Sequence, residues 1–283
     1  MTSVDQVAAR LRVLGELPGV AEAGEAAREA CTRLRFEEAL RRRTPEAAAE
    51  SRVRGARASA ALDGAEVPVA RVRALVSGAA EWGSDPVDRA LRGAVQATSE
   101  SEHVVGLVLG APWQALARLH VAASAGVLPE SQVGRPRNAG EDARELLEVG
   151  PAASPGEVAV RLGSVVDLCQ AALTPGVPGL VVAALVHAEV AAVRPFVAGN
   201  AVVARAAERA LLQATGLDPT GVAVPEVGHL RGGLAPYVGA LAAYATGSLE
   251  GVGLWLRHCA EAVVAGAEEG MRVCAAVRAG RLA

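Results

Sequence analysis

The segment AAVRPFVAGNAVVARAAERA, residues 191–210, holds the residues whose types and spacing are best suited to binding an anion. Gly199 and Asn200 stand at a turn before an Ala-, Arg- and Glu-rich stretch that predicts a helix. Asn is a good N-cap residue, and the N–H groups that follow it have no partner within their helix. Together with the helix dipole they form an anion site, which Arg194 and Arg205 flank. From these residues alone, the favoured interpretation is an ordinary corner between two helices, capped by Asn200, with two surface arginines.

The composition limits the chemistry that the chain can perform. Its 283 residues are 51% hydrophobic, which is enough for the core of one large domain or two small ones. The chain contains no Lys, which excludes a P-loop lysine, a Schiff base and a Ser-x-x-Lys nucleophile. The dominance of Ala, Gly, Val and Arg is typical of a GC-rich bacterial genome. The net charge of −3 provides no general attraction to nucleic acid or membrane, so neither is expected as a partner.

The sequence contains no recognisable metal-binding or targeting motif. The spacing of the cysteines and histidines matches no metal motif, so we expect no metal site and a reducing, cytoplasmic location. His187 lies on the most apolar segment and reads as a satisfied core histidine rather than a ligand. The amphipathic N-terminus predicts no signal peptide, and the longest apolar run is too short for a bilayer span. The cysteines are Cys31, Cys169, Cys259 and Cys274.

A hydrophobic period of about 3.6 residues predicts an all-α protein. Thr44-Pro45 and Ser154-Pro155 are typical helix starts, and Asp63-Gly64 is a typical helix stop. The run 179–193 is expected to be the most buried helix, and residues 127–140 to form a loop or short hairpin beside the turn. Other helices are expected near 3–14, 20–40, 44–62, 68–79, 112–125, 155–172, 200–214, 226–232, 234–246 and 248–280, with one more opening at Pro86.

The order and spacing of several motifs resemble those of Fic-domain proteins, whose typical activity is the transfer of AMP from ATP to a protein hydroxyl. Residues 187–205, HAEVAAVRPFVAGNAVVAR, are similar to the family signature H-P-F-x-[D/E]-G-N-G-R-x-x-R. The likeness continues over LARLHVAASAGVLPESQVGRPR and over the C-terminal helices that contain Tyr237 and Trp255. It implies a Fic-type helical bundle with a short flap, built as a helical region 1–83 and a Fic-like core 84–283. The matching signature positions are Pro195, Phe196, Gly199, Asn200 and Arg205.

The chain departs from this signature where the family keeps its chemistry. Arg194 stands in place of the catalytic His, and an arginine, with a pKa above about 12, cannot take a proton from a hydroxyl. Ala198 replaces the acid that binds Mg²⁺, Ala201 replaces the second Gly, and Val202 replaces the first phosphate-binding Arg. The resemblance therefore implies a turn that is retained as a scaffold without its chemistry. The residues of the phosphate cradle that remain are Gly199, Asn200 and Arg205.

A second resemblance lies upstream, in the segment SAALDG. It is similar to the family's inhibitory pattern [S/T]-x-x-x-E-[G/N], which would begin here at Ser59 and end at Gly64. In regulated members the Glu of this pattern pairs with the last Arg of the signature. Asp63 holds the acid position, and its expected partner Arg205 is retained. Because Asp-Gly is also an ordinary helix stop, both interpretations stay open.

Three functions are compatible with these residues. The leading one is a degenerate Fic-domain protein without AMP-transferase activity that acts through binding or regulation on an unidentified protein partner. It requires no cofactor, and the missing ligands disfavour the binding of ATP and Mg²⁺. The second is a divergent Fic enzyme that transfers a nucleotide or phosphate-containing group, with Arg194 as a phosphate clamp. The third is a purely structural or interaction protein. The sequence leaves open whether the chain forms a homodimer.

Overall fold

In the computed structural model, residues 3–124, 126–145 and 149–281 are described, and every regular element within these ranges is helical. This confirms the all-α prediction. The helices are α1 (Ser3–Gly15), α2 (Val20–Arg35), η1 (Glu38–Arg41), α3 (Thr44–Leu62), α4 (Val69–Val76), α5 (Pro86–His103), α6 (Pro112–Ser124), η2 (Glu130–Gln132), α7 (Pro155–Ala171), α8 (Gly179–Val193), α9 (Asn200–Ala214), α10 (Pro225–His229), α11 (Leu234–Ala245) and α12 (Leu249–Arg278).

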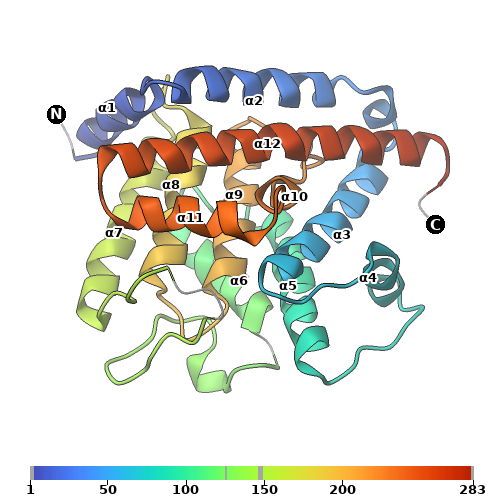
Figure 1. Ribbon diagram of the computed structural model, residues 1–283, viewed down its shortest axis with the longest axis horizontal. Coiled ribbons are helices and arrows are strands. Elements are labelled where there is room, and N and C mark those ends of the chain that lie inside the picture. The colour runs from blue at the N-terminus through green and yellow to red at the C-terminus, as the bar shows by residue number, and fades with distance from the viewer. Residues whose placement is uncertain (1–2, 125, 146–148, 282–283) are drawn as a thin grey trace.

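Helices α8 and α9 lie at the centre of the molecule (Figure 1). Helix α8 is apolar on nearly all faces, and it is accordingly surrounded by other helices. Helices α7, α11 and α12 contact α8, whereas α5 and α6 contact α9. The turn 194–199 joins the two central helices, so the surrounding bundle fixes its position.

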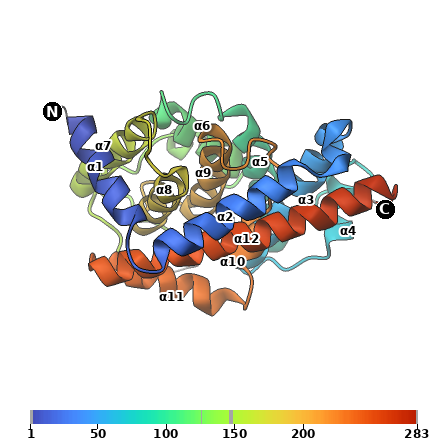
Figure 2. The ribbon, with the colours of Figure 1, turned by 90° about the horizontal axis from the view of Figure 1, so that it is seen from above.

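The longest helix, α12, runs along α2 on one side of the central pair (Figure 2). Small residues allow this close packing. A Cβ atom on Gly270 of α12 would lie 2.7 Å from a methyl group of Leu34, and one on Gly228 of α10 would lie 2.0 Å from the carbonyl oxygen of Ala262. The Ala- and Gly-rich composition therefore supports contacts that larger side chains would prevent.

The helix expected over 20–40 is interrupted. Helix α2 ends at Arg35, and a short 3₁₀ helix follows. Leu34 before the break and Ala39 after it are both buried. Because the apolar pattern continues across the break, hydrophobic periodicity could not reveal it.

The charged side chains of α9 are buried in the core. Arg205, Glu208 and Arg209 are no more than 4% exposed. Arg209 donates two hydrogen bonds of 2.9 Å to Glu226 of α10, and a Cβ atom on Gly55 of α3 would lie 2.6 Å from its Nη2 atom. Helix α9 is thus buried along nearly its whole length, as α8 is.

Residues 127–140 form a loop beside the turn, one of the two forms predicted for this segment, and the short 3₁₀ helix η2 lies within it. The N–H group of Arg137 donates to the carbonyl of Pro195 at 2.7 Å. Beyond this loop, the N–H group of Arg144 donates to the carbonyl of Val197 at 2.6 Å. These two backbone hydrogen bonds hold the loop and the residues after it against the turn.

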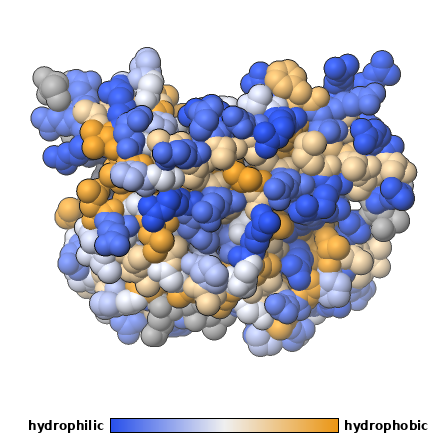
Figure 3. Space-filling model, turned by 45° about the horizontal axis from the view of Figure 1, so that its top comes forward, coloured by the Kyte–Doolittle hydropathy of each residue, from blue (hydrophilic) through white to orange (hydrophobic). Residues whose placement is uncertain are grey.

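The described helices include none with both the length and the hydropathy that a bilayer span requires. On the face shown in Figure 3, hydrophilic and hydrophobic side chains are interspersed. This face therefore presents no single large apolar region.

Candidate functional site

The side chain of Asn200 closes the turn between α8 and α9. Its Oδ1 accepts a hydrogen bond from the N–H of Phe196 at 2.8 Å, and its Nδ2 donates to the carbonyl of the same residue at 3.0 Å. Gly199, with a φ of 79°, holds the N-cap position instead. The prediction that Asn200 caps α9 is therefore wrong. Because its amide is directed back over the turn, it does not cap the N–H groups that follow.

A carboxylate of the chain itself lies at the start of α9. Oε1 of Glu145 accepts hydrogen bonds from the backbone nitrogen of Asn200 at 2.7 Å and from its Nδ2 at 2.6 Å. The positive end of a helix dipole stabilises such a carboxylate, and an external anion would bind at the same place. Burial raises the pKa of Glu145, and the hydrogen bonds from Asn200 act in the opposite direction.

Sequence reasoning missed Glu145. It lies 55 residues before Asn200, outside any motif, and a contact of this kind has no periodic signal. Only the path of the loop that follows the flap brings the two residues together.

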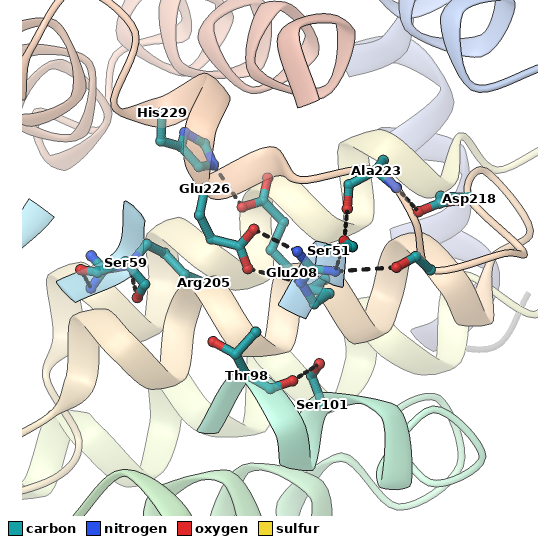
Figure 4. Close-up of polar contacts among 12 residues, drawn as sticks. Ser51, Ser59, Thr98, Ser101, Arg205, Glu208, Asp218, Ala223, Glu226 and His229 are labelled. Carbon is teal, nitrogen blue, oxygen red and sulfur yellow. Dashed lines mark hydrogen bonds and ion pairs between the residues drawn. The ribbon is translucent and has the colours of Figure 1, made fainter. Parts of the chain in front are cut away.

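Arg205 is directed to α3 rather than to the start of its own helix (Figure 4). Its Nε donates to the Oγ of Ser59 at 2.8 Å, and its Nη2 donates to the carbonyl of Ser59 at 3.1 Å and to Asp63 at 2.7 Å. Its Nη1 lies 3.5 Å from the hydroxyl of Tyr237. Burial would lower the pKa of Arg205, but Asp63 and Tyr237 raise it above its ordinary value. The contact that the sequence predicts between Asp63 and Arg205 is present.

Arg194 adopts a left-handed conformation, with a φ of 51°, and ends α8. This conformation is disfavoured for residues other than Gly, so the surrounding contacts must hold it. The guanidinium donates to the carbonyl of Gly150, and the carbonyl of Arg194 accepts a hydrogen bond of 2.8 Å from Arg137. Arg194 and Arg205 thus contact different segments of the chain.

His120 of α6 connects the flap to the turn. Its ring stacks on Phe196, with centroids 4.0 Å apart and planes inclined by 10°. Nδ1 accepts a hydrogen bond from the N–H of Gly134 at 2.9 Å, and Nε2 lies 3.2 Å from the carbonyl oxygen of Ala198. The neutral ring must therefore carry its proton on Nε2. The sequence predicted that His120 lies on a helix, but it did not indicate that the ring contacts the turn 194–199.

Acid is expected to destabilise the protein through His120. Burial lowers the pKa of this histidine to about 4, whereas the pKa of an unfolded histidine is about 6.5. Between these values the unfolded chain binds more protons, so the free energy of unfolding falls as the pH decreases. We expect a loss of up to about 3 kcal/mol from this residue between pH 6.5 and 4. Urea unfolding of the wild type and of His120→Asn checks this, and an equal pH dependence in both would contradict it.

No protein-family model and no curated protein matches the sequence. Solved structures do match. A Fic family protein from Desulfovibrio desulfuricans G20 superposes with a TM-score of 0.71 at 19% identity, covering 90% of this chain and 74% of that chain. A Fic-1 fragment from C. elegans gives a TM-score of 0.62 at 19% identity, covering 93% of this chain and 75% of that chain. A Fic domain containing signaling protein from Bacteroides thetaiotaomicron VPI-5482 gives a TM-score of 0.62 at 14% identity, covering 89% of this chain and 98% of that chain. These superpositions show a shared fold.

Proposed function

We propose that this chain, which has the fold of Fic proteins, acts through binding and does not transfer AMP. The observation that supports this most is the position of two carboxylates. Glu145 accepts hydrogen bonds from Asn200 at the start of α9, and Asp63 pairs with Arg205 at 2.7 Å. A nucleotide phosphate would need the same donors, so the chain's own side chains compete with it.

Among the described residues, the turn 194–199 itself carries no side chain that could act as the general base. Arg194 stands where the resemblance places the catalytic His, and its guanidinium stays protonated. The imidazole of His120 lies nearby, but Gly134 occupies its Nδ1 and its Nε2 faces a carbonyl. His120 therefore does not replace the missing base.

The donor set does not fit a nucleotide-bound Mg²⁺. This ion prefers carboxylate and phosphate oxygens in octahedral geometry, and Ala198 offers no carboxylate at the expected position. Glu145 places a carboxylate at the turn, but its Oε1 already accepts hydrogen bonds from two nitrogens of Asn200.

The alternative of an enzyme that uses Arg194 as a phosphate clamp has no specific support. The guanidinium of Arg194 donates to the carbonyl of Gly150, and Arg205 is directed to α3. A binding or regulatory role is the simpler proposal.

The test is incubation of the purified protein with labelled ATP and Mg²⁺, alone and with a bacterial lysate. A catalytically active Fic protein in parallel reactions controls for the assay. We expect no labelled band from the wild type, because base and metal ligand are both absent. Labelling above background that requires this protein would contradict the proposal.

A further inference from the structure

We propose that His187, Glu208 and His229 bind a transition metal ion such as Zn²⁺ within the helical core. These three residues come from α8, α9 and α10, respectively. The site is separate from the turn at the start of α9. The inference therefore does not depend on whether the protein transfers AMP.

The positions of the three side chains carry this inference. One ligand atom from each residue lies within 4.8 Å of the other two. Nδ1 of His187 and Nε2 of His229 are each 2.7 Å from the same oxygen, Oε2 of Glu208, and Figure 4 shows the contact between His229 and Glu208. All three side chains are no more than 1% exposed. Two imidazole nitrogens with one carboxylate oxygen are a ligand set that Zn²⁺ uses in proteins.

The outer nitrogens of both histidines have partners that allow metal binding. Nε2 of His187 lies 2.8 Å from the hydroxyl of Tyr237, and Nδ1 of His229 lies 3.1 Å from Nε2 of His258. A hydroxyl and an imidazole can each donate or accept a hydrogen bond. Without metal, the inner nitrogens hold the protons and donate to Glu208. When metal binds, each proton moves to the outer nitrogen of its ring, where its partner accepts it. Such outer hydrogen bonds are typical of metal-bound histidines.

The carboxylate of Glu208 is the acidic group of the proposed site, and its Oε2 contacts both histidines. Within the described part of the chain, Oε1 of Glu208 is buried and has no nitrogen or oxygen partner, although the thiol of Cys259 contacts this carboxylate. A thiol is a weak hydrogen-bond donor, and a bound cation would satisfy the buried oxygen better.

The surroundings favour a borderline metal. The buried thiol of Cys259 lies beside the Glu208 carboxylate. Sulfur and imidazole near one carboxylate favour Zn²⁺ or Co²⁺ over Mg²⁺ or Ca²⁺. His258, whose Nε2 lies 3.1 Å from the outer nitrogen of His229, lines a surface pocket of about 500 Å³.

The test is a calorimetric titration of chelator-treated full-length protein with ZnCl₂, with bound zinc counted by mass spectrometry after gel filtration. We expect one Zn²⁺ per chain and a higher melting temperature. His229→Gln and Glu208→Gln each remove a ligand and are expected to weaken binding more than about 100-fold, whereas Tyr237→Phe should weaken it about 10- to 100-fold. The matched control is His103→Gln, an exposed histidine on α5 that should leave binding unchanged.

Absence of stoichiometric zinc from the wild type would overturn the proposal. So would unchanged binding by a folded His229→Gln variant, because the zinc would then be adventitious. If both ligand variants fail to fold, the absorption spectrum of the Co²⁺-loaded wild type shows whether the ion occupies the proposed site. With one water beside the three side chains, intense bands of four-coordinate Co²⁺ are expected, and the weak spectrum of six-coordinate Co²⁺ would contradict the site.

Discussion

Restoring the whole Fic signature is expected to produce AMP transfer that no single restoration produces. Arg194→His supplies a general base, which typically contributes about 10²–10⁴ in rate. It leaves no ligand for Mg²⁺ and only part of the phosphate cradle, which would position and stabilise the reacting phosphate. The structure adds that two internal carboxylates must also be removed. The full variant combines Arg194→His, Ala198→Asp, Ala201→Gly, Val202→Arg, Asp63→Gly and Glu145→Ala.

Self-modification with labelled ATP, located by mass spectrometry, measures this effect. We expect weak labelling of the full variant and none of the wild type or of Arg194→His alone. The matched control carries Arg194→Ala within the same combined variant, which should lower labelling about 10²–10⁴-fold because only the base is missing. Robust labelling by the wild type would show that Arg194 has a catalytic role that we have not assigned.

Breaking the buried pair of Arg209 and Glu226 is expected to destabilise the fold strongly. Both side chains are no more than 4% exposed, and two hydrogen bonds of 2.9 Å join them. Glu226→Gln leaves the guanidinium buried without its counter-charge, which costs about 3–5 kcal/mol. Glu25→Gln breaks an exposed pair with Arg28 and should cost less than about 1 kcal/mol.

Urea unfolding of both variants measures the difference in free energy. The double variant Arg209→Met/Glu226→Leu should recover much of the loss, because apolar residues of similar size remove the unpaired charge. A cost below about 1 kcal/mol for Glu226→Gln would mean that water or another group compensates the charge of Arg209.

Local patterns in the sequence predicted most of the helices. Helices α8 and α9 begin and end at the predicted residues, because Pro and Gly mark the start of α8 and the turn between the two helices. The apolar sequence of α8 likewise predicted its burial. The burial of α9 was not predicted, and the local interpretation that placed Arg194 and Arg205 at the surface was wrong, because both are buried. The charges of α9 are buried because their partners come from α3 and α10, and pairing between distant segments leaves no periodic signal.

The candidate site was predictable only in part. The resemblance to Fic proteins predicted the pairing of Asp63 with Arg205, which composition and periodicity alone did not. Glu145 had no motif to indicate it, and its contact with Asn200 depends on the path of a loop. Similarly, the scattered histidines gave no hint that His187 and His229 meet at Glu208.

We propose that Glu145 and Asp63 occupy the donors that a nucleotide phosphate would need, and calorimetric titration with Mg·ATP tests this claim most directly. We expect no saturable heat from the wild type or from Glu141→Ala, which removes a carboxylate of the same loop that pairs with Arg135. The double variant Asp63→Ala/Glu145→Ala should acquire weak binding, because it exposes the guanidinium of Arg205 and the start of α9. Tight, saturable binding of Mg·ATP by the wild type would contradict the claim.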